Sequence, residues 1–373
     1  MRILYGVQGT GNGHLSRARA MARAFTAHPD VQIDWLFSGR ERADFFDMEC
    51  FGDWQWRRGL TFVTAAGRIR PLATVAQLPL RGFLRDVRTL DPRDYDVVIS
   101  DFEPVTAWAA RLRGCPCIGI GHQYALRPGV PRSHRHLVGS AVLASFAPVG
   151  TGVGLHWHHF GLPILPPIVD HDARAARGAP SPREALVYLP FEDADAVTAL
   201  LHEIPDWHFT MFAPGLREET LDNVARHPVA RAPFIAVLAR ASHVICNSGF
   251  ELVSEALHLG RHVLARPLHG QMEQHSNALA LEQLGLGRVA HRLDHATLTA
   301  FLATDGPAPR RHWPDVAAAI AAWVVARDES LAELATRLWL ACDPRLERPA
   351  AGCGPHKKRP AIVSPAFFAN WSE

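Results

Sequence analysis

Short apolar runs alternate with amphipathic helical stretches along most of the 373 residues, and this alternation limits the folds open to the chain. A continuous apolar run bounded by turn residues is typical of a parallel strand, because helices on both faces of the sheet hide both faces of that strand. Strands are predicted in two series, at 2–7, 31–37, 96–100 and 117–121, and then at 185–189, 208–212, 243–246 and 262–266. Helical patterns between them indicate βαβ units and therefore an α/β fold.

A proline-rich stretch separates the two series. Residues 161–169 read GLPILPPIV, which holds too much proline for a helix or a central strand, and a polar stretch rich in Ala, Gly and Pro follows at 170–182. We predict an N-terminal Rossmann-like domain at 1–168, a C-terminal one at 183–342 and an irregular tail at 343–373. Two doubly wound domains would face each other across a cleft at the carboxyl ends of their strands, where such sheets bind ligands.

Composition excludes several other classes of protein. The 39 basic and 37 acidic residues nearly balance, so nothing marks a general nucleic-acid binder. The six cysteines include no CxxC pair and are too few for a disulfide framework in a chain of this length. The chain begins MRILYGV, which predicts a strand and not a signal peptide, and glycines and a proline interrupt its longest uncharged run. We expect no membrane-spanning helix and a cytoplasmic location.

The first predicted strand runs into a glycine-rich turn, GTGNGH at 9–14, which a helical pattern follows. Such a turn lets a ligand approach the backbone, and a helix N-terminus attracts anions. The residues that we expect to contact a phosphate or an acceptor are Gly11, Asn12, Gly13 and Arg17. A dinucleotide fingerprint is disfavoured, because its third glycine would fall on His14 and because Asp34 lies within the second strand instead of after it.

His14 at this turn is a candidate general base, since an imidazole titrates near neutral pH. Asp101 follows the strand at 96–100, which should open onto the same crevice, and its carboxylate could fix the tautomer of the ring and raise its basicity. Simpler roles stay open: His14 as an exposed or capping residue, and Asp101 as the N-cap of a helix over 103–111. His122, at the end of the neighbouring strand, is the next candidate base.

The most informative stretch spans 243–285 and predicts strand, turn, helix, strand, loop and helix: HVICNSGFELVSEALHLGRHVLARPLHGQMEQHSNALALEQLG. Its candidate ligand-binding residues are Asn247, Ser248, Gly249, Glu255, Glu273, Gln274 and Asn277. The first three form a strand-to-helix turn whose amides can receive a phosphate. Glu255 lies two turns into the helix, at a reach suited to a ribose diol. Glu273 and Gln274 can hydrogen-bond sugar hydroxyls, and Asn277 would anchor the second helix.

These motifs resemble those of sugar-transferring enzymes. The resemblance to the enzyme that glycosylates the lipid-linked peptidoglycan precursor lies in GTGNGHLSRARAMA and in CNSGFELVSEALHLG. A further run, GQMEQHSNA, resembles the DQxxNA motif of UDP-dependent glucosyl- and glucuronosyltransferases. Over residues 1–292 the chain therefore resembles inverting glycosyltransferases of GT-B architecture, closest to a family 28-like group of bacterial and archaeal proteins. The two Rossmann-like domains predicted above are what that architecture requires.

The resemblance implies a nucleotide-diphosphate sugar as donor, most readily a UDP-sugar. Ser248 and Gly249 would hold its pyrophosphate, Glu255 its ribose, and Glu273 with Gln274 the transferred sugar. His14 and Asp101 would be the base and its partner. No cofactor and no metal are implied, because helix-terminal amides would stabilise the leaving diphosphate. Glu273 replaces the aspartate of the DQxxNA motif, which leaves the sugar open.

An arginine-rich segment at 54–93 bears on the acceptor. It carries eight arginines against two aspartates, with apolar side chains between them. Such a segment suits an anionic, lipid-linked acceptor or the inner face of an anionic membrane, and a solvated helix face explains it equally well. The acceptor therefore stays open between a small molecule and a lipid-linked glycan, and peripheral membrane contact stays open with it.

Two pairs of residues have the spacing of metal ligands, but neither pair is interpreted as a metal site. His156 and His158 would share one face of a strand, but no acidic or sulfur ligand accompanies them. Asp193 and Asp195 resemble a DxD metal motif, yet they come after a strand and are better explained as the start of a helix, whose dipole they complement.

Two functions other than transfer stay open at this point. A nucleotide-sugar 2-epimerase would share the two-domain architecture and need no acceptor. A non-catalytic nucleotide-sugar-binding protein would keep Glu255 and lose turnover. The three functions differ in what they yield: a glycosylated acceptor, an epimer, or binding alone.

Overall fold

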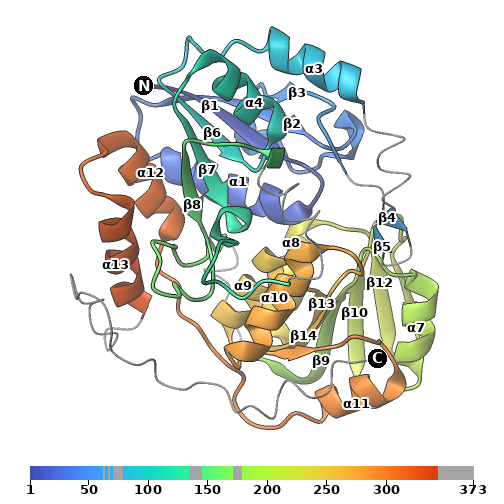
Figure 1. Cartoon of the computed structure of the whole chain (residues 1–373). Helices are drawn as coiled ribbons and strands as arrows, with labels where there is room; N and C mark the ends of the chain where they lie inside the picture. The colour runs from blue at the N-terminus through green and yellow to red at the C-terminus, as the bar shows by residue number, and fades with distance from the viewer. Residues whose placement is uncertain (62–63, 66–67, 70–78, 134–144, 171–178, 343–373) are drawn as a thin grey trace.

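The structure is a computed structural model that describes residues 1–342 apart from 62–63, 66–67, 70–78, 134–144 and 171–178. It forms two α/β units, each built on its own largely parallel sheet (Figure 1). The predicted fold class, two doubly wound sheets, is therefore confirmed. The predicted tail at 343–373 and most of the stretch at 170–182 lie outside the described residues, so the domain boundaries stay predictions.

The first unit contains a six-stranded parallel sheet in the part of the chain that the structure describes. Its strands are β1 Arg2–Gln8, β2 Gln32–Ser38, β3 Gln55–Trp56, β6 Val97–Asp101, β7 Cys117–Gly121 and β8 Thr151–Gly154, in the spatial order β3-β2-β1-β6-β7-β8. Its helices are α1 Asn12–Phe25, α3 Leu80–Thr89 and α4 Pro104–Arg113, with short 3₁₀ helices η1 Arg42–Asp44, η2 Glu49–Phe51 and η3 His122–Ala125. A small antiparallel pair is formed by β4 Thr64–Ala65 and β5 Arg68–Ile69.

The second unit contains, among the residues described, a seven-stranded sheet that is parallel except for its edge strand β11. Its strands are β9 Ser181–Tyr188, β10 His208–Phe212, β11 Glu219–Leu221, β12 Val224–His227, β13 Ala241–Asn247, β14 His262–Arg266 and β15 Arg288–Val289, in the order β11-β12-β10-β9-β13-β14-β15. Its helices are α7 Ala194–His202, α8 Arg231–Arg240, α9 Phe250–Leu259, α10 Met272–Gln283 and α11 His295–Leu302, and the chain continues into α12 Val316–Ala326 and α13 Leu331–Cys342.

Burial on both faces explains why the central strands are apolar throughout. In β1, Ile3 and Tyr5 belong to one apolar cluster, and Leu4 between them belongs to another on the opposite face. In β13, Val244 and Ile245 divide in the same way. Side chains alternate between the two faces of a strand, so a sheet covered by helices on both sides needs apolar residues at every position.

All eight predicted strands are present, and β9 begins four residues earlier than predicted, at Ser181. The strands that the sequence did not predict are short. They are β3, β8, β11, β12 and β15, at or beside the edges of the two large sheets, and the separate pair β4 and β5. The proline-rich stretch 161–169 forms no strand and contributes only an isolated bridge between Leu155 and Leu165.

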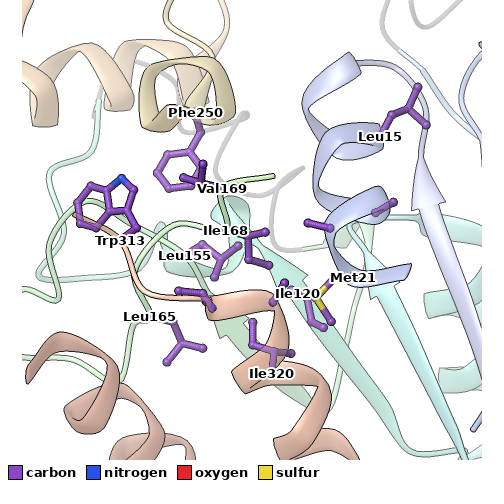
Figure 2. Packing of buried hydrophobic residues seen from close by; sticks show 14 of the residues in the cluster. Leu15, Met21, Ile120, Leu155, Leu165, Ile168, Val169, Phe250, Trp313 and Ile320 are labelled. Carbon is purple, nitrogen blue, oxygen red and sulfur yellow. The ribbon is translucent and has the colours of Figure 1, made fainter. Parts of the chain in front are cut away.

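One apolar cluster joins the two units. Leu15 and Met21 of α1 belong to the same cluster as Phe250 of α9 and Ile320 of α12 (Figure 2). Helices α9 and α12 both contact α1, so α12 packs against the first unit although it follows the second sheet in sequence. The N-terminus of α1 is thereby held beside α9, and the site forms there. Among the described residues, no helix is long and apolar enough to cross a bilayer.

Candidate active site

His14 and Asp101 meet at the carboxyl edge of the first sheet. His14 lies in the first turn of α1 and Asp101 is the last residue of β6. The His14 Nδ1 atom lies 2.7 Å from the Asp101 Oδ1 atom. The Asp101 side chain is completely buried, whereas 14% of the His14 side chain is exposed. The predicted pair is thus in hydrogen-bond contact, with the histidine toward solvent and the aspartate behind it.

The charge state of Asp101 sets the tautomer of His14. Burial alone would raise the pKa of the Asp101 carboxyl, but the Arg17 guanidinium and the His14 ring hold it below its ordinary value. An ionised carboxylate only accepts hydrogen bonds, so we assign the Nδ1 proton to His14, as donor to Asp101. Arg17 Nη2 lies 2.8 Å from the same nitrogen and is assigned as a donor to Asp101 Oδ1 instead. The lone pair of Nε2 is then free to take a proton.

Arg17 completes this cluster and does not face an open phosphate site. Its Nε atom donates to Asp101 Oδ2 at 2.7 Å, and its Nη1 atom donates to Glu251 of α9. The side chain is 1% exposed. Burial would lower the pKa of Arg17, but Asp101 and Glu251 raise it. We therefore correct the expectation that Arg17 contacts a phosphate or an acceptor, because two carboxylates already neutralise it.

Asp101 does not cap the helix that follows it. The N-cap of α4 is Glu103, whose carboxylate accepts from the backbone amides of Val105 at 2.9 Å and Thr106 at 2.7 Å. The capping role left open for Asp101 is therefore wrong. Between the two acids, Phe102 adopts a φ of 52°, a left-handed conformation that is costly for a side chain of this size and that recurs at functional sites.

The glycine loop contacts the second unit. Gly11 is the N-cap of α1, and the next residue, Asn12, donates to the Tyr188 hydroxyl at the end of β9 at 3.1 Å. A β-carbon at Gly13 would collide with the carboxylate of Glu251. The glycine at this position therefore lets α9 approach the loop closely.

Glu255 of α9 is covered by α1 of the first unit. Its Oε1 atom accepts from Ser16 Oγ at 3.0 Å and lies 3.4 Å from Nη2 of Arg231, which also pairs with Asp170. The residue is 4% exposed, and burial raises the pKa of its carboxyl although Arg231 opposes the shift. Ser16 of α1 thus hydrogen-bonds one of the two carboxylate oxygens, so Glu255 is buried where α1 packs against α9.

The turn at 247–249 offers side-chain groups and not the amides that were predicted. The Ser248 amide donates to the carbonyl of Arg266 and the Gly249 amide to that of Asn247. In contrast, Ser248 Oγ and Asn247 Oδ1 are buried and have no hydrogen-bond partner within the described residues. Gly249 caps α9 without a side chain, so the amides of the first turn that follows remain for an anion.

The three predicted residues of α10 have different surroundings. Gln274 accepts from the Leu268 amide at 2.8 Å, which shapes the preceding loop. Asn277 donates to the Ser248 carbonyl at 2.9 Å and ties α10 to the turn. The Glu273 carboxylate accepts a hydrogen bond from Nε2 of Gln123 in the first unit, which lies 3.1 Å from each carboxylate oxygen. Glu273 therefore lies at the boundary between the units, while Gln274 is turned into its own loop.

His122 does not fit the role of alternative base. It is 1% exposed, its Nδ1 atom lies 2.8 Å from the Leu155 carbonyl, and its Nε2 atom contacts Asn277. Its ring stacks on Phe250 with the ring centres 4.1 Å apart. Both nitrogens are engaged away from solvent, so His122 links the two units.

The two residue pairs that were considered as metal ligands form hydrogen bonds with nearby backbone amides. Asp193 accepts from the amides of Asp195 and Ala196 and caps α7, as the sequence interpretation had it. His156 and His158 each accept a following backbone amide through Nδ1. Over the described part of the chain, no three His, Cys, Asp or Glu side chains gather as a metal site would need.

Comparison with known proteins identifies the family and the fold of this chain. Residues 1–304 match the family model described as glycosyl transferase family 1. Three solved structures each superpose with a TM-score of 0.52: the glycotransferase of kitacinnamycin, 17% identical over 81% of this chain and 89% of that one; the calicheamicin glycosyltransferase CalG4, 15% identical over 93% and 99%; and the spinosyn rhamnosyltransferase SpnG, 16% identical over 91% and 97%. A search of curated proteins gave no match. At these identities the structural likeness shows the fold.

Two Rossmann-like units that meet beside α1 and α9 define the GT-B architecture, and the chain is a GT-B glycosyltransferase. It belongs to glycosyl transferase family 1, whose model covers most of its length. The resemblance drawn from its motifs is thereby confirmed at the level of fold and activity class.

Proposed function

We propose that this glycosyltransferase transfers a sugar from a UDP-sugar to an acceptor hydroxyl with inversion at the anomeric carbon, and that His14 is the base. The observation that carries the proposal is the 2.7 Å contact between His14 and the buried, ionised Asp101 beside the N-terminal half of α9. A histidine with one nitrogen held by a carboxylate and the other free has the arrangement of a general base.

The proposed reaction follows from these groups. His14 Nε2 takes the proton of the acceptor hydroxyl while the hydroxyl oxygen attacks the anomeric carbon. The bond from that carbon to the diphosphate breaks on the opposite face, so the configuration inverts and UDP leaves with the bonding electrons. Asp101 stabilises the imidazolium that forms, because its negative charge is already present and fixed by Arg17.

Donor binding is assigned to the second unit. The unpartnered Ser248 hydroxyl and the first-turn amides of α9 support a diphosphate site there. Glu255 would bind the ribose after α1 has moved away, and Glu273 would contact the transferred sugar. This assignment uses residues of α9, α10 and the turn after β13, and Asn277 of α10 is hydrogen-bonded to Ser248 in that turn.

Product analysis tests the proposal directly. The full chain is incubated with UDP-sugars labelled in the sugar and with two acceptor sources, a membrane lipid extract and a panel of small hydroxyl compounds. Products are separated between butanol and water and identified by mass spectrometry and NMR. We expect UDP and a glycosylated product whose anomeric configuration is opposite to that of the donor. A labelled product in butanol would indicate a lipid-linked acceptor, and a labelled product in water that is distinct from the donor would indicate a small one. An epimerised donor, or binding with no product, would overturn the proposal in favour of an epimerase or a sensor.

Transfer should not require a divalent cation. If the Ser248 hydroxyl and helix amides stabilise the leaving diphosphate, the rate should be the same in excess EDTA and in added magnesium. The measurement is the initial rate of UDP release under both conditions. Loss of activity in EDTA that magnesium or manganese restores would contradict this mechanism.

We also propose that α3 contacts an anionic membrane that carries the acceptor. Of the segment 54–93, residues 62–63, 66–67 and 70–78 lie outside the described part. In α3, Leu80 and Leu84 are 54% and 46% exposed and lie one turn apart, while Val87 is buried. Exposed arginines flank them, namely Arg81, Arg85 and Arg88. Exposed leucines among arginines suit an anionic bilayer surface better than water alone.

Vesicle sedimentation tests this contact. The protein should sediment with phosphatidylglycerol vesicles at low salt, much less with phosphatidylcholine vesicles, and less again at high salt. The double variant Leu80→Glu/Leu84→Glu should lose binding because it adds charge where leucines enter the interface. Leu112→Glu, at a leucine of α4 that is 61% exposed, is the control. Equal sedimentation of the double variant and the parent would show that α3 is only a solvated helix.

A further inference from the structure

Gln123 bridges the two units between the residues that the proposed reaction uses. It lies in η3, directly after β7 of the first sheet, and is 8% exposed. Its Nε2 atom donates to the Glu273 carboxylate of the second unit, 3.1 Å from both oxygens. Its Oε1 atom is buried and accepts no hydrogen bond from any described residue. No sequence motif pointed to Gln123.

The unpaired oxygen lies beside the catalytic cluster. A β-carbon at Gly121 would be 3.0 Å from Gln123 Oε1, 3.4 Å from Arg17 Nη2 and 3.7 Å from Asp101 Oδ1. These three atoms therefore all lie close to the position that a β-carbon of residue 121 would occupy, and the glycine keeps that position free. Gln123 is thus the side chain that connects the His14 cluster on one side with the Glu273 carboxylate on the other.

The orientation of the Gln123 amide is fixed by charge. Turning the amide over would place Oε1 against the Glu273 carboxylate, two acceptors facing each other, so Nε2 must point to Glu273. Oε1 then faces away and can only accept. Its partner must be a donor such as a hydroxyl, and a phosphate or a carbonyl is excluded. A buried acceptor without a partner is unfavourable, and a sugar hydroxyl would satisfy it.

We propose that Gln123 determines sugar specificity: Oε1 accepts a hydrogen bond from one hydroxyl of the transferred sugar while Nε2 holds Glu273 in position to contact another. The inference rests on the proposed function, since it takes the transferred sugar to lie between His14 and α10. The separation of α1 from α9 that frees Glu255 from Ser16 would also admit the sugar to this position.

Donors that lack one hydroxyl each test the inference. Transfer is measured as kcat/KM for the parent with its best UDP-sugar and with the deoxy analogues of that donor. One analogue should be poorer by about 10- to 100-fold, the loss typical when a buried polar group stays unpaired. In Gln123→Met, which keeps the size but can neither accept through Oε1 nor hold Glu273 through Nε2, the intact donor and that analogue should be transferred equally well, both below the intact donor in the parent. UDP affinity, measured by calorimetry, should not change.

Two further variants keep the test decisive. Gln55→Met makes the same substitution on the edge strand β3 and should keep the discrimination of the parent. If Gln123→Met does not fold, Gln123→Asn withdraws the acceptor by one methylene and should lose the discrimination as well. Loss of UDP affinity together with an equal fall for all donors would show that Gln123 only joins the units and would overturn the inference. Unchanged discrimination in a folded variant would do the same. Absence of transfer in the parent would refute the proposed function itself.

Discussion

His14→Ala should lower kcat by about 10²- to 10⁴-fold, the usual contribution of a general base. The donor is assigned to the second unit, so its Kd should change little. The measurements are steady-state UDP release and calorimetric donor binding. His28→Ala, a histidine of the same unit beyond the end of α1, is the control and should be unaffected. Parental turnover in His14→Ala would remove the base from this loop, and His122 could not replace it because both its nitrogens are engaged.

Asp101→Asn tests whether the pair acts as one unit. The amide can still contact the ring but can select the wrong tautomer, so the loss of turnover should be at most about that of His14→Ala. The double variant should be barely worse than His14→Ala alone. Full additivity of the two losses would mean that Asp101 has a separate task.

Asp101→Asn should also lower the stability of the fold, which the sequence did not predict. Arg17 is buried between Asp101 and Glu251, so the amide leaves its charge with one partner. Breaking a buried ion pair costs up to about 3–5 kcal/mol. Turnover of Asp101→Asn must therefore be compared at a temperature where thermal unfolding shows it to be folded.

Local patterns were sufficient to predict the fold and the contact between His14 and Asp101. The apolar runs that became β1 and β13 are buried on both faces, so each run carries its own signal. The pairing of His14 with Asp101 followed from topology, since parallel strands end at one edge of the sheet. Short edge strands such as β15 contain only two residues and have no such pattern.

Contacts between the units could not be predicted from the sequence. Arg17 was assigned to an anion because its partner Glu251 is 234 residues away and belongs to the other unit. Gln123 had no signal at all, since its role depends on Glu273 and Gly121. Glu255 lies on the helix where it was expected, but its burial under Ser16 depends on how α1 packs against α9.

Glu255→Ala should weaken binding of the nucleotide sugar by about 1.5–3 kcal/mol, the range for hydrogen bonds to a charged group, which is roughly 10- to 160-fold in Kd. The variant should stay folded, because burial raises the pKa of this carboxyl and Arg231 keeps Asp170 as its partner. Ser16→Ala is the matched control: it removes the hydroxyl that competes with the ribose, so donor affinity should be unchanged or higher. Calorimetry with a UDP-sugar measures both. Equal affinity in Glu255→Ala and the parent would remove Glu255 from the donor site, and weaker binding in Ser16→Ala would mean that α1 contacts the donor instead of giving way to it.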